Sequence, residues 1–503
     1  MMGGLFDLPI MSVPIKVAIR ADAGAKIGMG HFARASAVAR ALAASGDTEI
    51  VLVTNIEGAS HAGAFFPDQT KILVLSPEEG DPALAMQALR RQIWHPDVLL
   101  LDQYGAVALW EVECAKSETK LVALDDLDAA RDADIIVRPQ GVTEGGNGNI
   151  VLAGPAYLPL SDHVVQLAHG TQPNSHKRLR LNICFGGSDP TGETAKAMEA
   201  VANLDQLDVD VIIGPGAQID PALVDTTARI PHIKLHRQPS QKELAALMAT
   251  ADLALGAGGV MLWERLCLGI PSLVIATAEN QLPQIESMLA SGAVRYLGYH
   301  SELDAASIAE GILALADNAA LRQKLSDLGP KIVDGRGALR LAAWIKALAL
   351  GFRDVQAEDA QDLLDWRTDE RNWQHNWDGS EKPAFDAHVA WLSGRLADPD
   401  CVFRILTLGK VPVGVVRFDL SDGGMSAYLS IYLVPAWHGK RMGLPLYCAA
   451  ERALRKSHPS VRRIVSRIHS ANTASERLHR DAGFDILASV ERQGWLDAVK
   501  EID

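Results

Sequence analysis

The sequence lacks paired cysteine motifs, long apolar runs and a secretion signal, which are the marks of metal-binding, membrane and secreted proteins. It holds five cysteines in 503 residues, and because no two of them form a Cys-x-x-Cys pair, neither a zinc ribbon nor a disulfide framework is indicated. No uncharged apolar run is long enough to cross a bilayer. Residues 1–15 lack the basic start and the small-residue cleavage site of a secretion signal, so they are interpreted as a leader extension. These absences favour a cytoplasmic location.

The sequence also has no cluster of basic residues of the kind that binds polyanions. The formal net charge is −14, and lysine and arginine form no stripe along the chain, which argues against nucleic acid and membrane surfaces as partners. Acids and histidines show no metal-ligand spacing, so no metal is expected. Small molecules or other proteins are the expected partners.

The order of apolar segments predicts an α/β protein of three domains. Residues 16–168 and 177–350 each alternate apolar strands with helices, a pattern typical of parallel sheets covered on both faces. The polar stretch 169–176 is interpreted as the linker between them. A shift in composition near Leu350, followed by a cluster of tryptophans, predicts a third domain over residues 354–503. The clearest predicted strands are Lys16–Ala21, Glu49–Thr54, Lys71–Leu75, Val98–Asp102, Leu121–Leu124, Ile135–Val137, Arg178–Phe185, Val209–Ile213 and Ser272–Ile275.

A histidine stands where a glycine-rich turn leads into a helix. The segment Arg20–Arg34 (RADAGAKIGMGHFAR) joins the first strand to an alanine-rich helix over Phe32–Ala44, with Gly28 and Gly30 in the turn and His31 just after it. Backbone N–H groups and the helix dipole favour an anion at such a helix start. His31 is therefore expected beside a bound phosphate; a histidine that merely caps the helix is the alternative.

Two more glycine-rich segments follow predicted strands. Gly186–Ser188 comes directly after the strand that ends at Phe185, and Asp189–Pro190 is expected to open the next helix. Ala257–Gly259 precedes a helix over Val260–Leu268. Ligands of such sheets bind beyond the carboxyl ends of the strands, so these glycines are expected to face one cleft and hold a diphosphate. A well-capped structural loop is the alternative.

Across residues 16–350 these segments resemble the UDP-sugar hydrolases of the pseudaminic acid pathway. The resemblance rests on Arg20–Arg34, on Gly186–Pro190 and on Ala257–Gln281. It implies two Rossmann-like domains in the GT-B arrangement of the glycosyltransferase MurG. It also implies hydrolysis of UDP-2,4-diacetamido-2,4,6-trideoxy-β-L-altropyranose, in which water attacks the sugar C1 and UDP departs with inversion.

The resemblance assigns roles to individual residues. His31 is the expected catalytic base, since imidazole titrates near neutral pH, and Glu264 is the expected acceptor of the uridine ribose hydroxyls. Asn280 and Gln281 are an expected pair of amide contacts to the sugar or to the attacking water, but they equally fit a turn. Asp22 and Arg34 belong to the His31 segment, and they equally fit a local ion pair. The expected substrate-binding residues are Asp22, Gly28, Gly30, Arg34, Gly186, Gly187, Ser188, Gly258, Gly259, Glu264, Asn280 and Gln281.

The sequence departs from these hydrolases just after the third glycine segment. Val260 and Met261 stand where small hydroxyl residues are usual, so two hydrogen bonds to phosphate are missing. Weaker UDP binding, a different substrate and reliance on backbone N–H groups are the three interpretations.

The third domain carries a second loop suited to phosphates. The β-rich run Met425–Val434 is followed by the loop Pro435–Gly443 and a helix through Leu454, and this order resembles GNAT-type N-acetyltransferases. In that family, backbone N–H groups of the loop hold the pyrophosphate of coenzyme A, so acetyl-CoA is the expected cosubstrate. The expected coenzyme-binding residues are His438, Gly439, Lys440, Arg441, Gly443 and Asn472.

Two replacements set this loop and the following helix apart from the GNAT pattern. Arg441 occupies the place of a central glycine, where its side chain either contacts phosphate or crowds the loop. His479 occupies the place of a tyrosine that protonates the leaving thiolate, so it is the expected general acid; a surface histidine is the alternative. The acceptor side, Leu364–Arg367 and Phe385–Trp391, resembles acetyltransferases that act on amino-sugar nucleotides.

Together the two resemblances imply a bifunctional enzyme. The third domain would acetylate the 4-amino group of a UDP-linked trideoxy amino sugar, and the first two would hydrolyse the product for a nonulosonic acid of flagellin or other surface glycans. Transient association with neighbouring enzymes of that pathway is expected. A MurG-like glycosyltransferase with an accessory acyltransferase, and a nucleotide-sugar-binding scaffold with degraded sites, are the alternatives.

Overall fold

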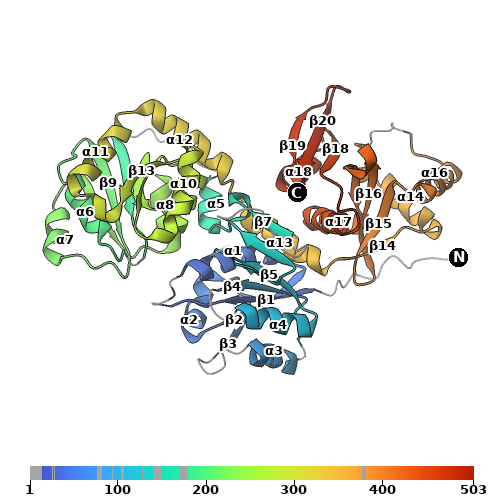
Figure 1. Ribbon diagram of the computed structural model, residues 1–503, viewed down its shortest axis with the longest axis horizontal. Coiled ribbons are helices and arrows are strands. Elements are labelled where there is room, and N and C mark those ends of the chain that lie inside the picture. Colours follow the sequence, from blue (N-terminus) through green and yellow to red (C-terminus); the bar gives the residue numbers. More distant parts are fainter. Residues whose placement is uncertain are drawn as a thin grey trace.

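The computed structural model describes residues 14–24, 27, 29–75, 82–92, 94–103, 107–126, 129–139, 150–168, 178–187, 189–375 and 381–502. Figure 1 shows three lobes. We call the lobes with the sheets of the predicted ranges 16–168 and 177–350 the first and second Rossmann units. The lobe of the predicted range 354–503 is called the acetyltransferase domain, after the resemblance noted in its sequence. Gly28, Ser188 and the predicted linker at 169–176 lie outside the described residues.

The first Rossmann unit is built on a parallel seven-stranded sheet of order β3-β2-β1-β4-β5-β6-β7. Its buried strands are rich in Val, Ile and Leu because both faces are covered by helices. The strands are β1 (Ile15–Ala21), β2 (Thr48–Thr54), β3 (Lys71–Val74), β4 (Val98–Asp102), β5 (Lys120–Leu124), β6 (Ile135–Arg138) and β7 (Ile150–Ala153). The helices between them are α1 (Gly30–Ala43), α2 (Ile56–Phe65), α3 (Pro82–Arg91) and α4 (Val107–Ser117).

The second Rossmann unit repeats this plan with a parallel six-stranded sheet of order β10-β9-β8-β11-β12-β13. The strands are β8 (Leu179–Cys184), β9 (Leu207–Ile213), β10 (Ile233–Arg237), β11 (Leu253–Ala257), β12 (Ser272–Ala276) and β13 (Arg295–Tyr299). The helices are α6 (Glu193–Val201), α7 (Pro221–Thr227), α8 (Gln241–Ala249), α9 (Val260–Cys267), α10 (Leu282–Ala290), α11 (Ala305–Ala316) and α12 (Ala319–Ile332).

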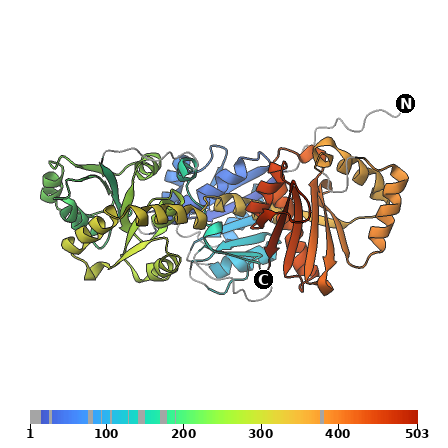
Figure 2. The ribbon, with the colours of Figure 1, turned by 90° about the horizontal axis from the view of Figure 1, so that it is seen from above.

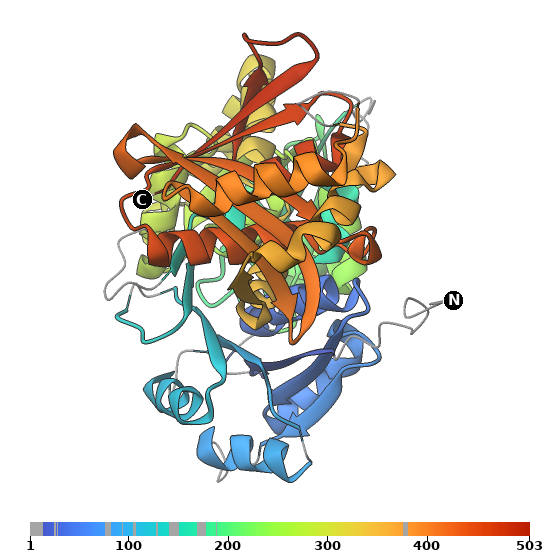
Figure 3. The same cartoon turned by 90° about the vertical axis from the view of Figure 1, so that its right-hand side faces the viewer.

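The acetyltransferase domain has a mixed seven-stranded sheet of order β14-β15-β16-β17-β18-β20-β19, in which β17 and β18 are the parallel neighbours. Figure 3 shows this sheet and its helices in front, above the first Rossmann unit. The strands are β14 (Gly351–Asp354), β15 (Cys401–Leu408), β16 (Val411–Ser421), β17 (Ser426–Leu433), β18 (Arg463–His469), β19 (Asp485–Ala488) and β20 (Trp495–Glu501). The helices are α14 (Ala360–Thr368), α15 (Glu370–Trp373), α16 (Phe385–Ala397), α17 (Gly443–Ser457) and α18 (Thr473–Asp481).

Two helices pack outside the domain in which the sequence analysis placed them. Helix α5 (Asp162–Ala168), within the predicted range 16–168, packs against α8 and α9 of the second unit. Helix α13 (Gly337–Ala349), within the predicted range 177–350, packs between α1 and α17. Figure 2 shows α12 and α13, in gold, crossing from the second unit toward the acetyltransferase domain. One hydrophobic core therefore runs from the first unit through α13 into the acetyltransferase domain.

Within the two Rossmann units the predicted strands are confirmed to within about one residue at most ends, but the sequence analysis gave no range for β7, β10, β11 or β13. The helix expected to open at Asp189–Pro190 begins instead at Glu193, because the Asp189 carboxylate accepts hydrogen bonds from the backbone N–H of Glu193 (3.0 Å) and Thr194 (2.8 Å). None of the described helices is both long and apolar enough to cross a membrane.

Candidate active sites

The side chain of His31 is held by a carboxylate from the neighbouring strand. Asp102 ends β4, and its Oδ1 lies 2.6 Å from His31 Nδ1. Both side chains are buried. Nδ1 also lies 3.0 Å from Arg34 Nη2, which only donates, whereas the Asp102 carboxylate only accepts. The shorter contact, to Asp102, favours a proton on Nδ1, which leaves the lone pair at Nε2. This is the pairing by which a histidine base is oriented in hydrolytic sites.

Arg34, one turn further along α1, ties two acidic strand ends together. Its guanidinium donates to Asp102 at 2.7 and 3.2 Å and to Asp126, just after β5, at 2.9 Å. Burial opposes the charge of Arg34, but the two carboxylates raise its pKa far above the usual value. Arg34 therefore acts in an ion-pair network that fixes Asp102, which in turn fixes His31.

Asp22 has a similar bracing role on the other side of the turn. Its carboxylate accepts from Arg20 at 2.5 and 2.7 Å and from the backbone N–H of Asn55 at 2.8 Å. These contacts agree with the local ion pair that the sequence analysis left open. Gly30 begins α1 and faces open space, because no atom lies within 4 Å of where a Cβ would stand.

The first glycine segment of the second unit is an open backbone turn. Gly186 follows β8 with φ of +94°, a conformation that favours glycine. Neither Gly186 nor Gly187 has an atom within 4 Å of a Cβ position, so the backbone is accessible to a ligand. Because α6 begins only at Glu193, these glycines are not at a helix start as expected.

The second glycine segment is braced from behind by two glutamines. Gln281 Oε1 accepts from the backbone N–H of Gly258 (3.2 Å), and Gln284 Nε2 donates to the Gly258 carbonyl (2.6 Å). A Cβ on Gly258 would stand 2.5 Å from Ile285. Gly259 directly precedes α9, and Asn280 is exposed. Gln281 is therefore placed to shape the loop, whereas the exposed Asn280 is the better placed of the two predicted amide contacts.

Glu264, the expected ribose contact, lies one turn into α9. The surrounding protein strips water from its carboxylate, which raises the pKa of Glu264 to about 7. Met261, one of the two departures from the hydrolase pattern, has its sulfur 3.6 Å from Cys184 Sγ. The position after the glycines therefore serves packing in this chain.

Replacing Glu264 by glutamine is expected to stabilise the protein at alkaline pH. Because the folded-state pKa of Glu264 exceeds that of a free glutamate, its contribution to stability is full below about pH 4.5 and is lost as pH rises through 7. The variant lacks this loss, so its free energy of unfolding should exceed the wild-type value by about 1–3 kcal/mol at pH 8 and converge with it near pH 5. Denaturant titrations at the two pH values measure the difference; an equal difference at both would contradict it.

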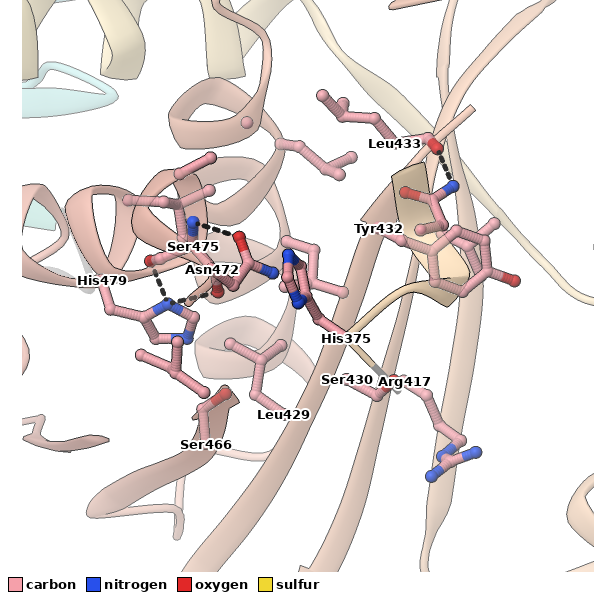
Figure 4. Close-up of a pocket in the computed structure, with 18 of the residues that line it drawn as sticks. His375, Arg417, Leu429, Ser430, Tyr432, Leu433, Ser466, Asn472, Ser475 and His479 are labelled. Carbon is pink, nitrogen blue, oxygen red and sulfur yellow. Dashed lines mark hydrogen bonds between the residues drawn. The ribbon is translucent and has the colours of Figure 1, made fainter. Parts of the chain in front are cut away.

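A cavity of about 1940 Å³ opens in the acetyltransferase domain where β17 and β18 separate. These strands pair only from Ser426 to Tyr428, and Figure 4 shows the later part of β17, with Leu429–Leu433, facing α18 across the cavity. Single-ligand pockets are typically about 300–1000 Å³. The cavity is therefore large enough for a donor and an acceptor together.

The predicted coenzyme loop lies at this cavity. Gly439 and Arg441 have φ of +78° and +56°, so the loop is tightly turned, and Gly443 begins α17 with its α-carbon so close to α18 that a Cβ would stand 2.8 Å from Leu478. His438 lies with Nε2 3.1 Å from Asn372 Oδ1, and Lys440 lies over the ring of Trp437 at 5.0 Å. His438 thus holds α15 against the loop.

Asn472 directly precedes α18 and His479 lies within it, on the other wall of the cavity. Asn472 Oδ1 caps the helix by accepting from the backbone N–H of Ser475 (3.0 Å). His479 is buried, at 1% exposure, and its Nδ1 donates to the Ser475 carbonyl at 2.8 Å (Figure 4). Within the described residues, Nε2 has no hydrogen-bond partner.

These contacts do not support the general acid predicted at His479. Burial lowers the pKa of His479 to about 4, so the ring is neutral at pH 7, and with the proton on Nδ1 the Nε2 atom can only accept. The alternative of a surface histidine is wrong, because the side chain is buried. His479 is thus a buried acceptor at the base of the cavity.

Arg441 stands where a glycine is usual in the coenzyme loop, and its side chain either contacts phosphate or crowds the loop. Replacing Arg441 by glycine is expected to separate these two interpretations. The left-handed φ of Arg441 is strained for a residue with a Cβ, so the variant should unfold at a free energy within about 1 kcal/mol of wild type, despite the entropy cost of glycine. If the side chain contacts phosphate, KM for acetyl-CoA should rise about tenfold. Steady-state kinetics decide: a lower KM would show that the arginine crowds the loop.

Sequence analysis assigned no role to the partners that complete both sites. Asp102 ends β4 and Asp126 comes just after β5. Because β4 lies between β1 and β5 in the sheet, the strand order brings both acids to His31, which follows β1 in the chain. In the cavity, His375 stacks on His469 with ring centroids 5.2 Å apart. Both follow short segments without a recognisable motif. Among the described residues, no group of three or more His, Cys, Asp or Glu side chains could hold a metal ion.

Comparison with known proteins agrees with this division. Residues 349–485 match the acetyltransferase (GNAT) domain family, which implies acetyl-CoA as a cosubstrate. The chain is 25% identical over 347 residues to the spore coat polysaccharide biosynthesis protein SpsG of Bacillus subtilis, covering 66% of this chain and 98% of that protein. It is 22% identical over 435 residues to an uncharacterized protein of Methanocaldococcus jannaschii, covering 82% of this chain and 86% of that protein.

The two Rossmann units also have a solved structural counterpart. The crystal structure of Acinetobacter baumannii MurG superposes with a TM-score of 0.51 at 13% identity, covering 66% of this chain and 99% of that one. The chain therefore combines two Rossmann-type units in the GT-B arrangement with a C-terminal GNAT domain, which confirms the predicted fold class.

Proposed function

We propose that this chain is a bifunctional nucleotide-sugar enzyme that N-acetylates a UDP-linked amino sugar and hydrolyses the acetylated product to free sugar and UDP. The observation that carries the hydrolase half is the His31–Asp102 pair at the start of α1. The acetyltransferase half rests on the GNAT match and the cavity between β17 and α18.

In the hydrolytic step, His31 Nε2 takes a proton from water as the water oxygen attacks the sugar C1. Asp102 holds the Nδ1 proton and stabilises the imidazolium that forms. The C1–oxygen bond breaks, and the diphosphate departs as a stable anion without needing an acid. The open backbone at Gly186 and Gly187 and the turn at Gly258 and Gly259 would bind that anion, with Glu264 on the ribose hydroxyls.

In the acetyl transfer, the sugar amine gives up a proton and its nitrogen attacks the thioester carbonyl, expelling the coenzyme thiolate. His375 is the proposed proton acceptor. Its Nδ1 has no hydrogen-bond partner among the described residues, it points into the cavity in Figure 4, and burial together with His469 lowers its pKa, so the ring is neutral at pH 7. The polypeptide edge of β17 would orient the thioester.

The proposed substrate is the 4-amino precursor of UDP-2,4-diacetamido-2,4,6-trideoxy-β-L-altropyranose, within pseudaminic acid biosynthesis. The sequence blocks around His31 and Gly258 support this choice, and the similarity to a polysaccharide biosynthesis protein supports a role in surface glycans. Arg367, Arg395 and Arg417 line the cavity with Trp391, and such cations and an aromatic ring suit the diphosphate and base of a UDP-sugar acceptor.

A glycosyltransferase with an accessory acyltransferase is the second candidate, favoured by the MurG-like fold. It differs in one observable respect: the sugar is passed to an acceptor other than water. The buried His31–Asp102 pair serves either reaction, because a sugar hydroxyl and water are both activated by removal of a proton.

The test is UDP release from the UDP-linked 4-amino sugar, followed by chromatography with and without acetyl-CoA. We expect UDP and free sugar only when acetyl-CoA is present. Acetylation without UDP release would refute the hydrolase or its substrate, and release that depends on an added acceptor would identify a glycosyltransferase. No change in either product would refute the bifunctional proposal for this sugar.

A further inference from the structure

Near the predicted coenzyme loop, the cavity is lined by residues from outside the acetyltransferase domain as well as from within it. Its lining continues onto α13 and the end of α1, where Arg336, Leu339, Ala343 and Ser45 contribute. Helix α13 is clamped to the acetyltransferase domain by Arg336, whose Nη2 lies 2.6 Å from Asp481 Oδ2 of α18. The coenzyme loop therefore opens onto another unit of the protein and not onto bulk solvent alone.

The charge of this cavity is opposite to that of the chain. Among the described lining residues there are nine arginine or lysine side chains and three carboxylates, although the chain as a whole carries a net charge of −14. Lys346, Arg371 and Arg467 are paired with carboxylates just outside the lining, but cations still outnumber acids there. Such a local excess of cations in an acidic protein favours ligands with several negative charges.

Three of these cations come from different places around the coenzyme loop: Arg441 from the loop itself, Arg477 from α18, and Arg336 from the position just before α13. The side chains of Arg441 and Arg477 are exposed. The charge of Arg441 adds to burial in lowering the pKa of Lys346, on α13, and the charges of Arg336 and Arg477 both act on Asp481. Loop, α18 and α13 therefore share one electrostatic neighbourhood.

We propose that the nucleotide end of acetyl-CoA lies between the acetyltransferase domain and α13, so that Arg336, just before α13, and Leu339, within it, complete the coenzyme site. This inference rests on the proposed acetyltransferase activity. The pyrophosphate and the 3′-phosphate take the arginines, which bind phosphate by paired N–H donors. The partly buried Leu339, next to the small Ala343, offers an apolar surface to the adenine ring.

The experiment places a negative charge on α13. The Leu339→Glu variant of the full chain is titrated calorimetrically with coenzyme A and with 3′-dephospho-coenzyme A, beside Leu339→Gln. Leu109→Glu, on the exposed face of α4, makes the same change away from the cavity. We expect Leu339→Glu to weaken coenzyme A binding about tenfold, with a smaller loss for the dephospho form and for Leu339→Gln, and no loss in Leu109→Glu. The deficit should shrink at high salt, because screening weakens the repulsion.

Unchanged binding of coenzyme A to Leu339→Glu would overturn the inference while leaving acetyl transfer intact. Absence of coenzyme A binding to the wild-type chain would overturn both the inference and the proposed acetyltransferase. A second variant, Leu339→Cys, tests the same contact without a buried charge: coenzyme A should slow its modification by N-ethylmaleimide, whereas S-acetylpantetheine, which lacks the nucleotide, should not. Equal protection by both compounds, or by neither, would refute contact of the nucleotide with α13.

Discussion

Replacing His31 by glutamine is expected to lower the kcat of UDP release by about 10²- to 10⁴-fold, the usual contribution of a positioned base. Glutamine keeps a polar side chain next to Asp102 but cannot take a proton from water at neutral pH. Binding of UDP should change little, because the proposed diphosphate contacts are backbone groups. Acetyl transfer by the same preparation should be unchanged, which provides an internal check that the variant is folded.

Two companion variants sharpen this test. His61→Gln changes an exposed histidine on α2 of the same unit and should leave UDP release at the wild-type rate. Asp102→Asn removes the carboxylate that orients the ring, and it should lower kcat and shift the pH dependence of the reaction. If His31→Gln retains more than a tenth of the wild-type rate, the base lies elsewhere and the His31–Asp102 pair is structural.

Removing the carboxylate of Asp47 is expected to destabilise the protein by about 3–5 kcal/mol, since it leaves a buried ammonium group unpaired. Lys346 of α13 donates from Nζ to Asp47 Oδ1 at 2.6 Å, and both side chains are buried, with 3% and 7% of their surfaces exposed. The pair joins α13 to the segment after α1. Denaturant unfolding of Asp47→Ala, followed by tryptophan fluorescence, measures the loss.

The charge pair can be separated from its neighbours by two controls. In the double variant Asp47→Leu/Lys346→Met both charges are gone, and much of the stability should return. Glu49→Ala breaks an ion pair with the exposed Lys71 on the same sheet and should cost less than about 1 kcal/mol. A double variant as unstable as Asp47→Ala would contradict an origin in the unpaired charge.

The sequence predicted the elements of this fold better than their assembly. Apolar runs such as Val98–Asp102, and the strand and helix on either side of the glycine turn after Arg20, depend on local patterns, and the structure reproduces these elements. Which strands become neighbours is decided by tertiary packing, so the meeting of His31 with Asp102 could not be derived from spacing. The exchanged positions of α5 and α13 have the same cause.

The position of the proton on His479 shows a second limit of prediction from sequence. The motif around it indicated the correct place in the acetyltransferase domain, and Figure 4 shows it at the cavity wall. The tautomer and the pKa depend on the Ser475 carbonyl and on burial, and neither is encoded in a pattern of residue types. The roles of the predicted site residues therefore stay predictions until the variants are measured.

Because of the continuous core through α13, the order of the domains in space differs from their order in the sequence. In sequence, the second Rossmann unit separates the first from the acetyltransferase domain; in space, it is an insertion into a single body that those two form with α13. Any opening or closing of the second unit on the first therefore leaves the acetyltransferase domain fixed with respect to His31. Under the proposed function, an acetylated nucleotide sugar would pass from the cavity to His31 across a separation that does not change, and only the unit proposed to bind uridine would be free to move.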